Sequence, residues 1–347
     1  MNYHPAHAPH SVPALTPVAE PLYVITCIAN PARYLSRYRL YRTFEKHMAD
    51  SGVILYTIEC AFGDRPFEVT DPSNPLHIQL RAKDELWYKE NLMNLAVQRL
   101  PLSAKYIACI DADFQFARAD WAQETIQQLQ HYQVVQMFST VGYLNANHEM
   151  IRHRLGYLQT WQNHRGGIKN AFAEANIPPI PEDGYYPSGN GAQPWQDVGA
   201  PGAAWAYRRE AWDKLGGLID FGILGSGDYF MAAGLIGLMD RVIPRNYSPG
   251  FKSQLLKWQA AAERHVRRNV GIVSGTVMHY WHGRLSERGY GSRERILTAY
   301  QFNPTHDLKR DSAGLYQLED DHTERFIHMR DKIRTYFRSR NEDGIEE

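Results

Sequence analysis

The sequence predicts an α/β fold, formed by one large domain with a mixed, mostly parallel central sheet and flanking helices. Two observations support this prediction. Apolar, strand-like runs alternate with segments of helical spacing from residue 22 to about residue 132, and such alternation is typical of βαβ units. Hydrophobic residues make up 44% of the 347 residues and charged residues 22%, which is the composition of a globular chain.

The first half of the chain contains four predicted strands and three predicted helices. The run LYVITCIAN, residues 22–30, is an apolar strand that ends at the turn signal Asn-Pro. Apolar residues at helical spacing predict a helix over residues 32–52, which stops at a glycine. The remaining elements are strands over residues 53–63, 77–82 and 105–113, and helices over residues 83–101 and 120–132. Asp120 is a candidate N-cap for the last of these helices.

The second half of the chain has a different character. Residues 134–145 predict another strand, and residues 151–164 predict a helix. Residues 176–217 are dense in proline and glycine, and they include a short helix expected at about residues 209–215. Long irregular segments within a compact domain commonly form binding loops or lids, so we expect this segment to border a site.

The composition of the chain argues against several kinds of partner and of structural site. Lysine plus arginine equals aspartate plus glutamate, at 38 each, so no global field steers the chain toward nucleic acid or anionic lipid. Cys27, Cys60 and Cys109 lie in apolar runs and have the spacing of neither a disulfide framework nor a zinc motif. The N-terminus lacks the pattern of a signal peptide, and no apolar run approaches the roughly 18 residues that cross a membrane. We therefore expect buried thiols and a cytoplasmic location.

An acidic pair, Asp111 and Asp113, follows the fourth predicted strand. Their side chains would point the same way if the strand continued, because side chains alternate along a strand. In open α/β sheets, ligands collect at the carboxyl ends of strands, which is where this pair lies. Two like charges raise each other's pKa unless a cation lies between them. The pair therefore predicts a divalent-cation site, with a solvated turn as the alternative.

A single acid, Asp228, begins an apolar helix directly after the flexible sequence Gly-Ser-Gly. An acid at a helix start can cap the helix or complement its dipole. The small residues of GAPGAAWAYRREAWDKLGG, upstream of this acid, let a ligand or another backbone come close. Asp228 is a candidate general base, with a helix cap as the alternative.

Two histidines flank a tryptophan in the segment GTVMHYWHGRL. A strand here would place His279 on one face and His282 on the other, so only one of them would face a metal. We expect that residue to be His282, because it adjoins Gly283, where the strand opens into the next loop. A buried core histidine is the alternative for either residue.

Arginines interleaved with tyrosine follow the histidines. They are Arg284, Arg288, Arg293 and Arg295, with Tyr290 among them. The guanidinium fork makes paired, charge-assisted hydrogen bonds to phosphate, so this cluster predicts a phosphate site. For any single arginine of the cluster, a solvated basic loop is the alternative.

Four elements in this order resemble the nucleotide-sugar glycosyltransferases of the GT-A fold, in particular family 2-like members with a DxD motif. The elements are Asp-Ala-Asp after a strand, the GAAWAYRREAWDKLGG segment, the acid in GSGD, and a late histidine. LWYKENLMNLAV also resembles the helix that precedes the DxD strand in these enzymes. The resemblance covers roughly residues 22–296 and implies a Rossmann-like sheet. It divides the chain into a flexible arm (1–20), a nucleotide-sugar-binding βαβ half (21–135), an acceptor-binding and catalytic half (136–300) and a helical tail (301–347).

The resemblance also implies a metal cofactor, Mn²⁺ or Mg²⁺. Asp113 would ligate this ion, and Asp111 would contact the nucleotide ribose or a water bound to the metal. His282, or failing that His279, would be the late metal ligand. These assignments are carried over from the family and agree with the preference of such ions for hard oxygen donors.

Further roles follow from the same resemblance. Asp228 occupies the place of the general base in inverting hexosyltransferases, although those members often carry Glu-Asp or Asp-Asp where this chain has Gly-Asp. Arg284, Arg288 and Trp205 would contact the nucleotide sugar. The implied reaction moves a sugar from a nucleoside-diphosphate sugar to a hydroxyl group.

Several alternatives remain open from the sequence. The acceptor would be a saccharide or glycoconjugate, or else a hydroxymethylated base in DNA. The basic stretch KSQLLKWQAAAERHVRRN, which contains Trp258, could track phosphates, although the neutral net charge favours a solvated helix face. The chain could also be a GT-A protein that binds nucleotide sugar or carbohydrate without catalysis. Metal-dependent nucleotidyl transfer shares the fold but releases pyrophosphate.

Overall fold

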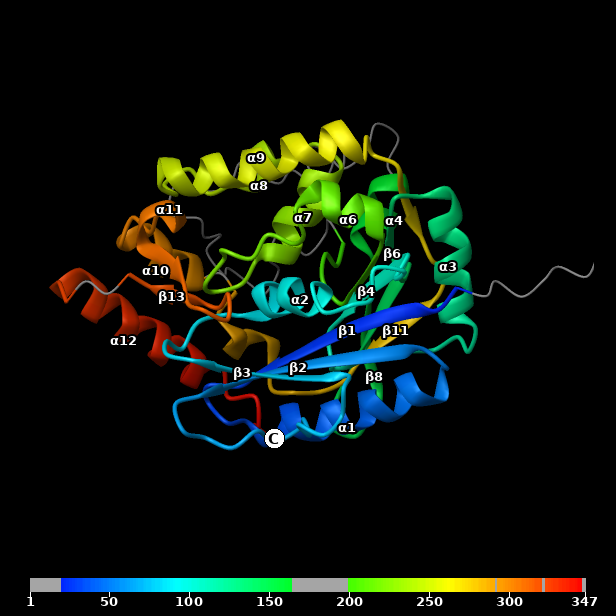
Figure 1. The fold of residues 1–347 in the computed structure, drawn as a ribbon, viewed down its shortest axis with the longest axis horizontal. Coiled ribbons are helices and arrows are strands. Elements are labelled where there is room, and N and C mark those ends of the chain that lie inside the picture. The colour runs from blue at the N-terminus through cyan, green and yellow to red at the C-terminus, as the bar shows by residue number, and fades with distance from the viewer. Residues whose placement is uncertain (1–19, 164–198, 291, 320–321, 345–347) are drawn as a thin grey trace, which may run out of the picture.

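A seven-stranded sheet with helices on both faces forms the centre of the computed structural model, which describes residues 20–163, 199–290, 292–319 and 322–344 (Figure 1). Its strands lie in the order β10-β6-β9-β4-β1-β2-β3. Neighbouring strands are parallel except where β9 lies antiparallel to β4 and to β6. The predicted mixed α/β fold with a mostly parallel central sheet is therefore confirmed.

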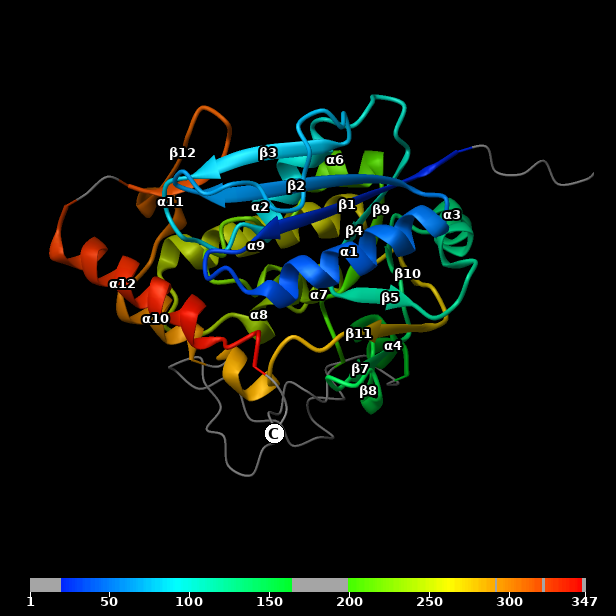
Figure 2. The ribbon, with the colours of Figure 1, turned by 90° about the horizontal axis from the view of Figure 1, so that it is seen from below.

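The strands fall into three sheets. The central sheet contains β1 (Leu22–Ala29), β2 (Ile54–Phe62), β3 (His77–Ala82), β4 (Tyr106–Ile110), β6 (Val134–Gln136), β9 (Ala204–Arg208) and β10 (Val270–Ile272). A second sheet, in the order β5-β11-β7-β8, contains β5 (Phe114–Phe116), β7 (Thr140–Leu144), β8 (Met150–Leu155) and β11 (Thr276–His279). Figure 2 shows these four strands side by side, next to the central sheet. β12 (Leu308–Arg310) and β13 (Tyr316–Leu318) form a separate antiparallel pair.

Helices cover both faces of the central sheet, and further helices lie beyond one end of it (Figure 1). They are α1 (Leu35–Asp50), α2 (Lys89–Val97), α3 (Trp121–His131), α4 (Tyr157–Asn163), α6 (Arg209–Leu215), α7 (Gly227–Leu235), α8 (Met239–Val242), α9 (Pro249–His265), the 3₁₀ helix η2 (Leu285–Arg288), α10 (Arg293–Ala299), α11 (Pro304–Asp307) and α12 (Glu324–Ser339). Because side chains alternate along β1, Tyr23 and Ile25 share a core with α2, α7 and α9. Leu22 and Val24 share a core with α1, α3 and the second sheet.

Tertiary contacts shorten one predicted helix. The pattern predicts a helix from residue 83, whereas α2 begins at Lys89. The amide of Trp87 donates to the carbonyl of Ile223 at 2.9 Å, and the carboxylate of Asp84 accepts the amide of Leu318 at 2.9 Å. These bonds hold the preceding residues against distant segments, so they do not join the helix.

Two further predicted elements are wrong in part. The strand expected over residues 134–145 is two strands, β6 and β7, because the amide of Met137 bonds to β9 while Ser139 and Thr140 bond to Gly275. The helix expected over residues 151–164 begins as β8, which pairs with β7, and only then becomes α4. In both places, pairing with a distant strand overrides the local pattern.

The expected cap of α3 is also wrong. Asp120 holds the N-cap position but makes no capping hydrogen bond with its side chain. Its carboxylate instead pairs with Arg118, at 2.6 and 2.7 Å. An exposed aspartate with a guanidinium two residues away has a strong competing partner.

Other expectations concern the cysteines and the termini. The three cysteines are unpaired, with Cys60 and Cys109 buried and Cys27 partly buried. Within the described parts of the chain, we find no helix with the length and apolar character needed to span a membrane. The expected N-terminal arm and most of the Pro/Gly-rich segment lie outside the described residues.

Candidate metal centre

A cavity of about 740 Å³ opens at the carboxyl ends of β1 and β4. Most of the residues predicted for the site line this cavity. They are Asp111, Asp113, Asp228, His279, His282 and Arg288. The strand-end position inferred from the sequence therefore brings the acidic pair, the candidate base and both histidines into one place.

Asp113 lies in the link between the two sheets. β4 ends at Ile110, and the amide of Asp111 donates to the carbonyl of Ala203 at 2.9 Å. β5 begins at Phe114 and pairs with β11. Because the chain leaves the central sheet here, the two acids do not follow the alternation of one strand, and each has partners of its own.

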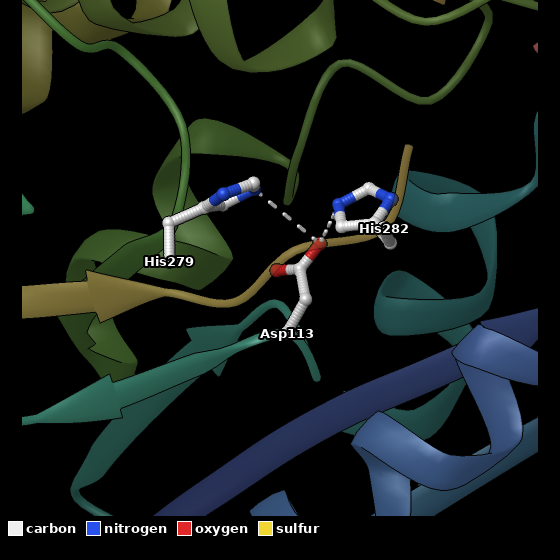
Figure 3. A group of neighbouring side chains, drawn as sticks. All are labelled: Asp113, His279 and His282. Atoms are coloured by element: carbon white, nitrogen blue, oxygen red, sulfur yellow. Dashed lines mark ion pairs between the residues drawn. The ribbon is translucent and has the colours of Figure 1, made fainter. Parts of the chain in front are cut away.

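Both late histidines face Asp113 (Figure 3). Nε2 of His282 lies 2.8 Å from Oδ2 of Asp113, and Nε2 of His279 lies 3.8 Å from the same oxygen. One donor atom from each of the three residues lies within 4.8 Å of the other two. The expectation that only one histidine would face the site is wrong, because β11 ends at His279 and strand alternation does not extend to His282.

The donor atoms of this triad have the character of an ion site. Among the residues that the structure describes, Oδ1 of Asp113 and both ring nitrogens of His282 are buried without a hydrogen-bond partner, although Nε2 of His282 lies 2.8 Å from Oδ2 of Asp113. Buried polar atoms are rarely left in this state. Two donor atoms bound to one ion at about 2.1 Å lie about 3 Å apart. Nε2 of His282 and Oδ2 of Asp113 are 2.8 Å apart, close to this value, whereas Nε2 of His279 is 3.8 Å from the same oxygen. A carboxylate with two imidazoles suits first-row divalent ions, Mn²⁺ among them.

The surrounding charges keep two of the triad residues in the forms that bind metal. Burial alone would raise the pKa of Asp113, but His282, His279 and Arg288 hold it below its usual range, so this residue is a carboxylate. Burial lowers the pKa of His279 to about 3, so its imidazole is neutral near pH 7. Metal ligands need these two forms. Nη1 of Arg288 lies 3.5 Å from Nε2 of His279 and competes for that nitrogen, which leaves His282 as the more accessible ligand.

A second group of charges surrounds Lys89 at the start of α2. Its Nζ lies 3.2 Å from Asp111, 3.7 Å from Oδ2 of Asp228 and 3.8 Å from Oε1 of Glu90. Burial raises the pKa of Glu90 to about 7 and that of Asp111 to about 6. Burial alone would lower the pKa of Lys89, but Asp111, Asp228 and Glu90 raise it well above its usual value. Lys89 is therefore an ammonium ion that holds three acids on one side of the cavity.

Asp228 lies in the first turn of α7, whose N-cap is Ser226. Oδ1 of Asp228 accepts the amide of Tyr229 at 2.8 Å, while Oδ2 faces Lys89 and Gly202. A Cβ atom on Gly202 would lie 2.5 Å from Oδ2, so the carboxylate requires a glycine there. The small residues upstream thus allow this carboxylate to approach closely. One carboxylate oxygen of Asp228 thus bonds within its own helix, and the other faces Lys89 beside the cavity.

Two buried guanidinium groups extend the cavity wall beyond the triad. Arg288 is 4% exposed and Arg293 is 7% exposed, and in the described chain neither Nε has a hydrogen-bond partner, although Nε of Arg293 lies 3.6 Å from Oε1 of Glu294. Arg288 donates to the hydroxyl of Tyr290 at 3.3 Å, and Arg293 lies over the Tyr290 ring at 5.0 Å. Arg293 also donates to Oγ of Ser226 at 2.7 Å. Buried guanidinium groups with unused donors suit a phosphate or another anion.

Two predicted nucleotide-sugar contacts do not line the cavity. Arg284 is exposed on the loop that precedes η2. Trp205 is buried in β9, and its indole donates to the carbonyl of Pro201 at 2.7 Å. Trp258, in the basic stretch of α9, is also buried, and its indole donates to Gly217 at 2.9 Å. It is not available at the surface for stacking on a base, which favours the solvated helix interpretation of that stretch.

Sequence reasoning missed two charged residues at this site. Lys89 lies in the segment LWYKENLMNLAV, but no local pattern distinguishes it from a solvated helical lysine. Glu342 lies near the C-terminus, and its carboxylate is 3.5 Å from Nδ1 of His282. Both contacts depend on how distant segments pack, which a local pattern does not encode.

Comparisons with known proteins give fold-level similarities. No protein-family model matches the chain, and no curated protein matches it. The catalytic domain of Drosophila β1,4-galactosyltransferase 7, solved with xylobiose, has 10% identity and a TM-score of 0.37, with 87% of this chain and 95% of that chain covered. Glucosyl-3-phosphoglycerate synthase from Mycobacterium tuberculosis, solved with Mn²⁺, UDP-glucose and phosphoglyceric acid, has 13% identity and a TM-score of 0.36, with 87% of each chain covered. Both are glycosyltransferases of the GT-A group that the sequence resembles. Because these superpositions are loose, we base the proposals below on the geometry of this chain.

Proposed function

We propose that this chain is a metal-dependent glycosyltransferase that moves a sugar from a nucleoside-diphosphate sugar to a hydroxyl group on a saccharide or glycoconjugate. One observation carries the proposal. The triad of Asp113, His279 and His282 shares a cavity with the buried guanidinium of Arg288 and with the carboxylate of Asp228. Together these residues supply a metal site, a positive charge and a carboxylate. Sugar transfer that releases a diphosphate requires groups of these three types.

The leaving group needs positive charge. Breaking the sugar–diphosphate bond leaves a nucleoside diphosphate whose negative charge grows as the bond lengthens. A divalent ion held by Asp113, His279 and His282 would offset part of that charge. Arg288 lies beside His279 and would donate its unused N–H to a diphosphate oxygen. Both contributions are strengthened by burial, because charges interact more strongly away from water.

The acceptor hydroxyl needs a base on the opposite side of the sugar. We assign this role to Asp228, because this residue lines the cavity and its Oδ2 lies 3.7 Å from the ammonium of Lys89. Asp111 lies at the same lysine, at 3.2 Å, and would accept a hydrogen bond from a ribose hydroxyl. With the base and the leaving diphosphate on opposite sides, the transfer would invert the configuration of the sugar carbon.

Product analysis tests the proposal. Wild-type protein incubated with Mn²⁺ and UDP-, GDP-, ADP- or dTDP-sugars should release the nucleoside diphosphate from at least one donor. Without an added acceptor this release should be slow, because water then takes the sugar. Asp113→Ala should abolish this release, whereas Asp120→Ala should not, because Asp120 is an exposed acid that pairs with Arg118. Release of pyrophosphate would instead indicate nucleotidyl transfer. Donor binding with no release would indicate a non-catalytic binding protein.

A second variant tests the base. Asp228→Asn keeps the size of the side chain and its contact with the amide of Tyr229, but removes the proton acceptor. It should lower turnover by about 10²-fold or more, the usual size of general-base effects, while donor affinity stays unchanged. Turnover near the wild-type value would assign Asp228 a structural role in the first turn of α7.

A further inference from the structure

The segment after α12, residues 340–344, returns to the metal centre and contacts both the start of α1 and the loop that follows β11. Hydrogen bonds hold it in place: the amide of Asn341 donates to the Tyr34 hydroxyl at 3.1 Å, and the indole of Trp281 donates to the carbonyl of Gly344 at 3.1 Å. Asp343 accepts the first amides of α1, from Leu35 at 2.8 Å and Ser36 at 2.7 Å. We call residues 340–344 the C-terminal segment.

The C-terminal segment packs directly against the backbone next to His282. Gly283 has a φ of +84°, and a Cβ atom there would lie 2.6 Å from the carbonyl oxygen of Asn341. The left-handed conformation and the close approach both require glycine at this position. The loop that carries His282 therefore has little freedom to move relative to the C-terminal segment.

Glu342, within this segment, is 1% exposed and lies between two guanidinium groups and His282. Arg37 donates to both carboxylate oxygens, at 2.5 and 2.7 Å, and Arg340 donates to Oε1 at 2.5 Å. Two guanidinium groups bound to one carboxylate favour its ionised form. Glu342 is thus a fixed, ionised carboxylate whose Oε2 lies 3.5 Å from Nδ1 of His282.

We propose that Glu342 is a positioning residue for the metal ligand His282. Its carboxylate favours the tautomer with the proton on Nδ1, which leaves the lone pair of Nε2, 2.8 Å from Oδ2 of Asp113, available to bind a cation that both atoms would share. Histidines that bind metals almost always donate their second N–H to a carboxylate, carbonyl or water, and this partner sets ring orientation and basicity. The inference rests on the proposed metal role of His282.

If Glu342 had a purely structural role, its substitution would have a different effect. If the carboxylate served only to pair Arg37 with Arg340, its loss would destabilise the fold without a specific effect on metal. The separation of 3.5 Å is longer than a well-formed hydrogen bond, so the contact acts mainly through charge. Glu342→Gln removes this charge and keeps the shape, which makes it the informative substitution.

The test compares Glu342→Gln with Asp343→Asn in the full chain, by calorimetric titration with Mn²⁺. Asp343 is the matched control, since it lies in the same segment and loses the same charge, but its carboxylate accepts the first amides of α1. Glu342→Gln should weaken Mn²⁺ binding by about 10-fold or more, the usual size of such effects, and Asp343→Asn should leave it unchanged. Equal losses in the two variants, or an unchanged affinity in Glu342→Gln, would overturn the proposal.

A measurement on the wild type covers the case in which Glu342→Gln does not fold. Nitrogen NMR of the protein with Mg²⁺, assigned by the signal missing in His282→Gln, should show the proton of His282 on Nδ1. A proton on Nε2 would overturn the proposal. His282→Ala separates this inference from its premise. If it leaves Mn²⁺ affinity intact, the metal role and the inference both fail; if it weakens binding and Glu342→Gln does not, only the inference fails.

Discussion

Replacing Lys89 by methionine removes an ammonium group that three acids share. Nζ of Lys89 lies 3.2 Å from Asp111, 3.7 Å from Asp228 and 3.8 Å from Glu90, and the lysine side chain is only 18% exposed. Methionine has a similar length and leaves no large void. The substitution therefore isolates the effect of the charge on these three acids.

The size of the effect follows from the distances. At an effective dielectric constant of about 20, unit charges separated by 3.2 Å attract by about 5 kcal/mol, and those at 3.7 or 3.8 Å by about 4.5 kcal/mol. Removing the ammonium also removes the cost of burying it, which offsets much of this attraction. Breaking one side of a buried ion pair typically costs about 3–5 kcal/mol, so we expect Lys89→Met to lower the free energy of unfolding by about 3 kcal/mol near pH 7.

The loss should depend on pH in a definite direction. Without the ammonium, the pKa values of Asp111 and Glu90, which burial already raises, should rise further, because the positive charge no longer opposes burial and the repulsion between the acids. An acid whose pKa is higher in the folded state than in the unfolded state favours folding at low pH, and this contribution is lost as pH rises. The loss caused by Lys89→Met should therefore be larger at about pH 8 than at about pH 5.

Urea unfolding of the wild type and Lys89→Met at both pH values measures this. Lys46→Met is the matched control, because Lys46 lies 2.7 Å from Asp50 but the two side chains are 76% and 63% exposed. The control should change stability by less than about 1 kcal/mol. A Lys89→Met variant that is no less stable than the control, or whose loss is the same at both pH values, would refute the reasoning.

Burial raises the pKa of Glu90 to about 7, so stability should fall as pH rises from about 4.5 to 7, and Glu90→Gln should flatten that fall in urea unfolding. His279→Ala and His282→Ala should both weaken Mn²⁺ binding in calorimetric titration, with the larger loss for His282, because Arg288 already lies 3.5 Å from Nε2 of His279. Gly283→Ala should lower both the Tm and the Mn²⁺ affinity, since its Cβ would displace the C-terminal segment; an unchanged affinity would mean that this segment does not support the site.

The parts of the fold that local patterns control could be predicted from the sequence. The apolar runs of β1, β2 and β4 and the helical spacing of α1 and α3 place those elements within a few residues. The second sheet could not be predicted, because β7 and β8 exist through pairing with each other and with β11. A local pattern does not report which distant strand a segment will meet.

The candidate site divides in the same way. Asp113 and Asp111 were identifiable because an acid pair at the end of a strand has a positional meaning in α/β sheets. The sequence did not reveal that His279 and His282 both face Asp113, because this arrangement depends on the residue at which β11 ends. Glu342 was out of reach for sequence reasoning, since it pairs with Arg37 across 305 residues of chain.

The metal role of Asp113 is tested most directly by titrating Mn²⁺ into the protein in the presence and absence of UDP, with Mg²⁺ as a comparison. We predict one Mn²⁺ site in the wild type, bound more tightly than Mg²⁺ because of the two imidazoles, and tightened further by the diphosphate. Asp113→Ala should lose this site and its coupling to UDP, whereas Asp120→Ala should keep both. Mn²⁺ binding in Asp113→Ala that equals the wild type, with the same response to UDP, would contradict a metal-dependent glycosyltransferase centred on this triad.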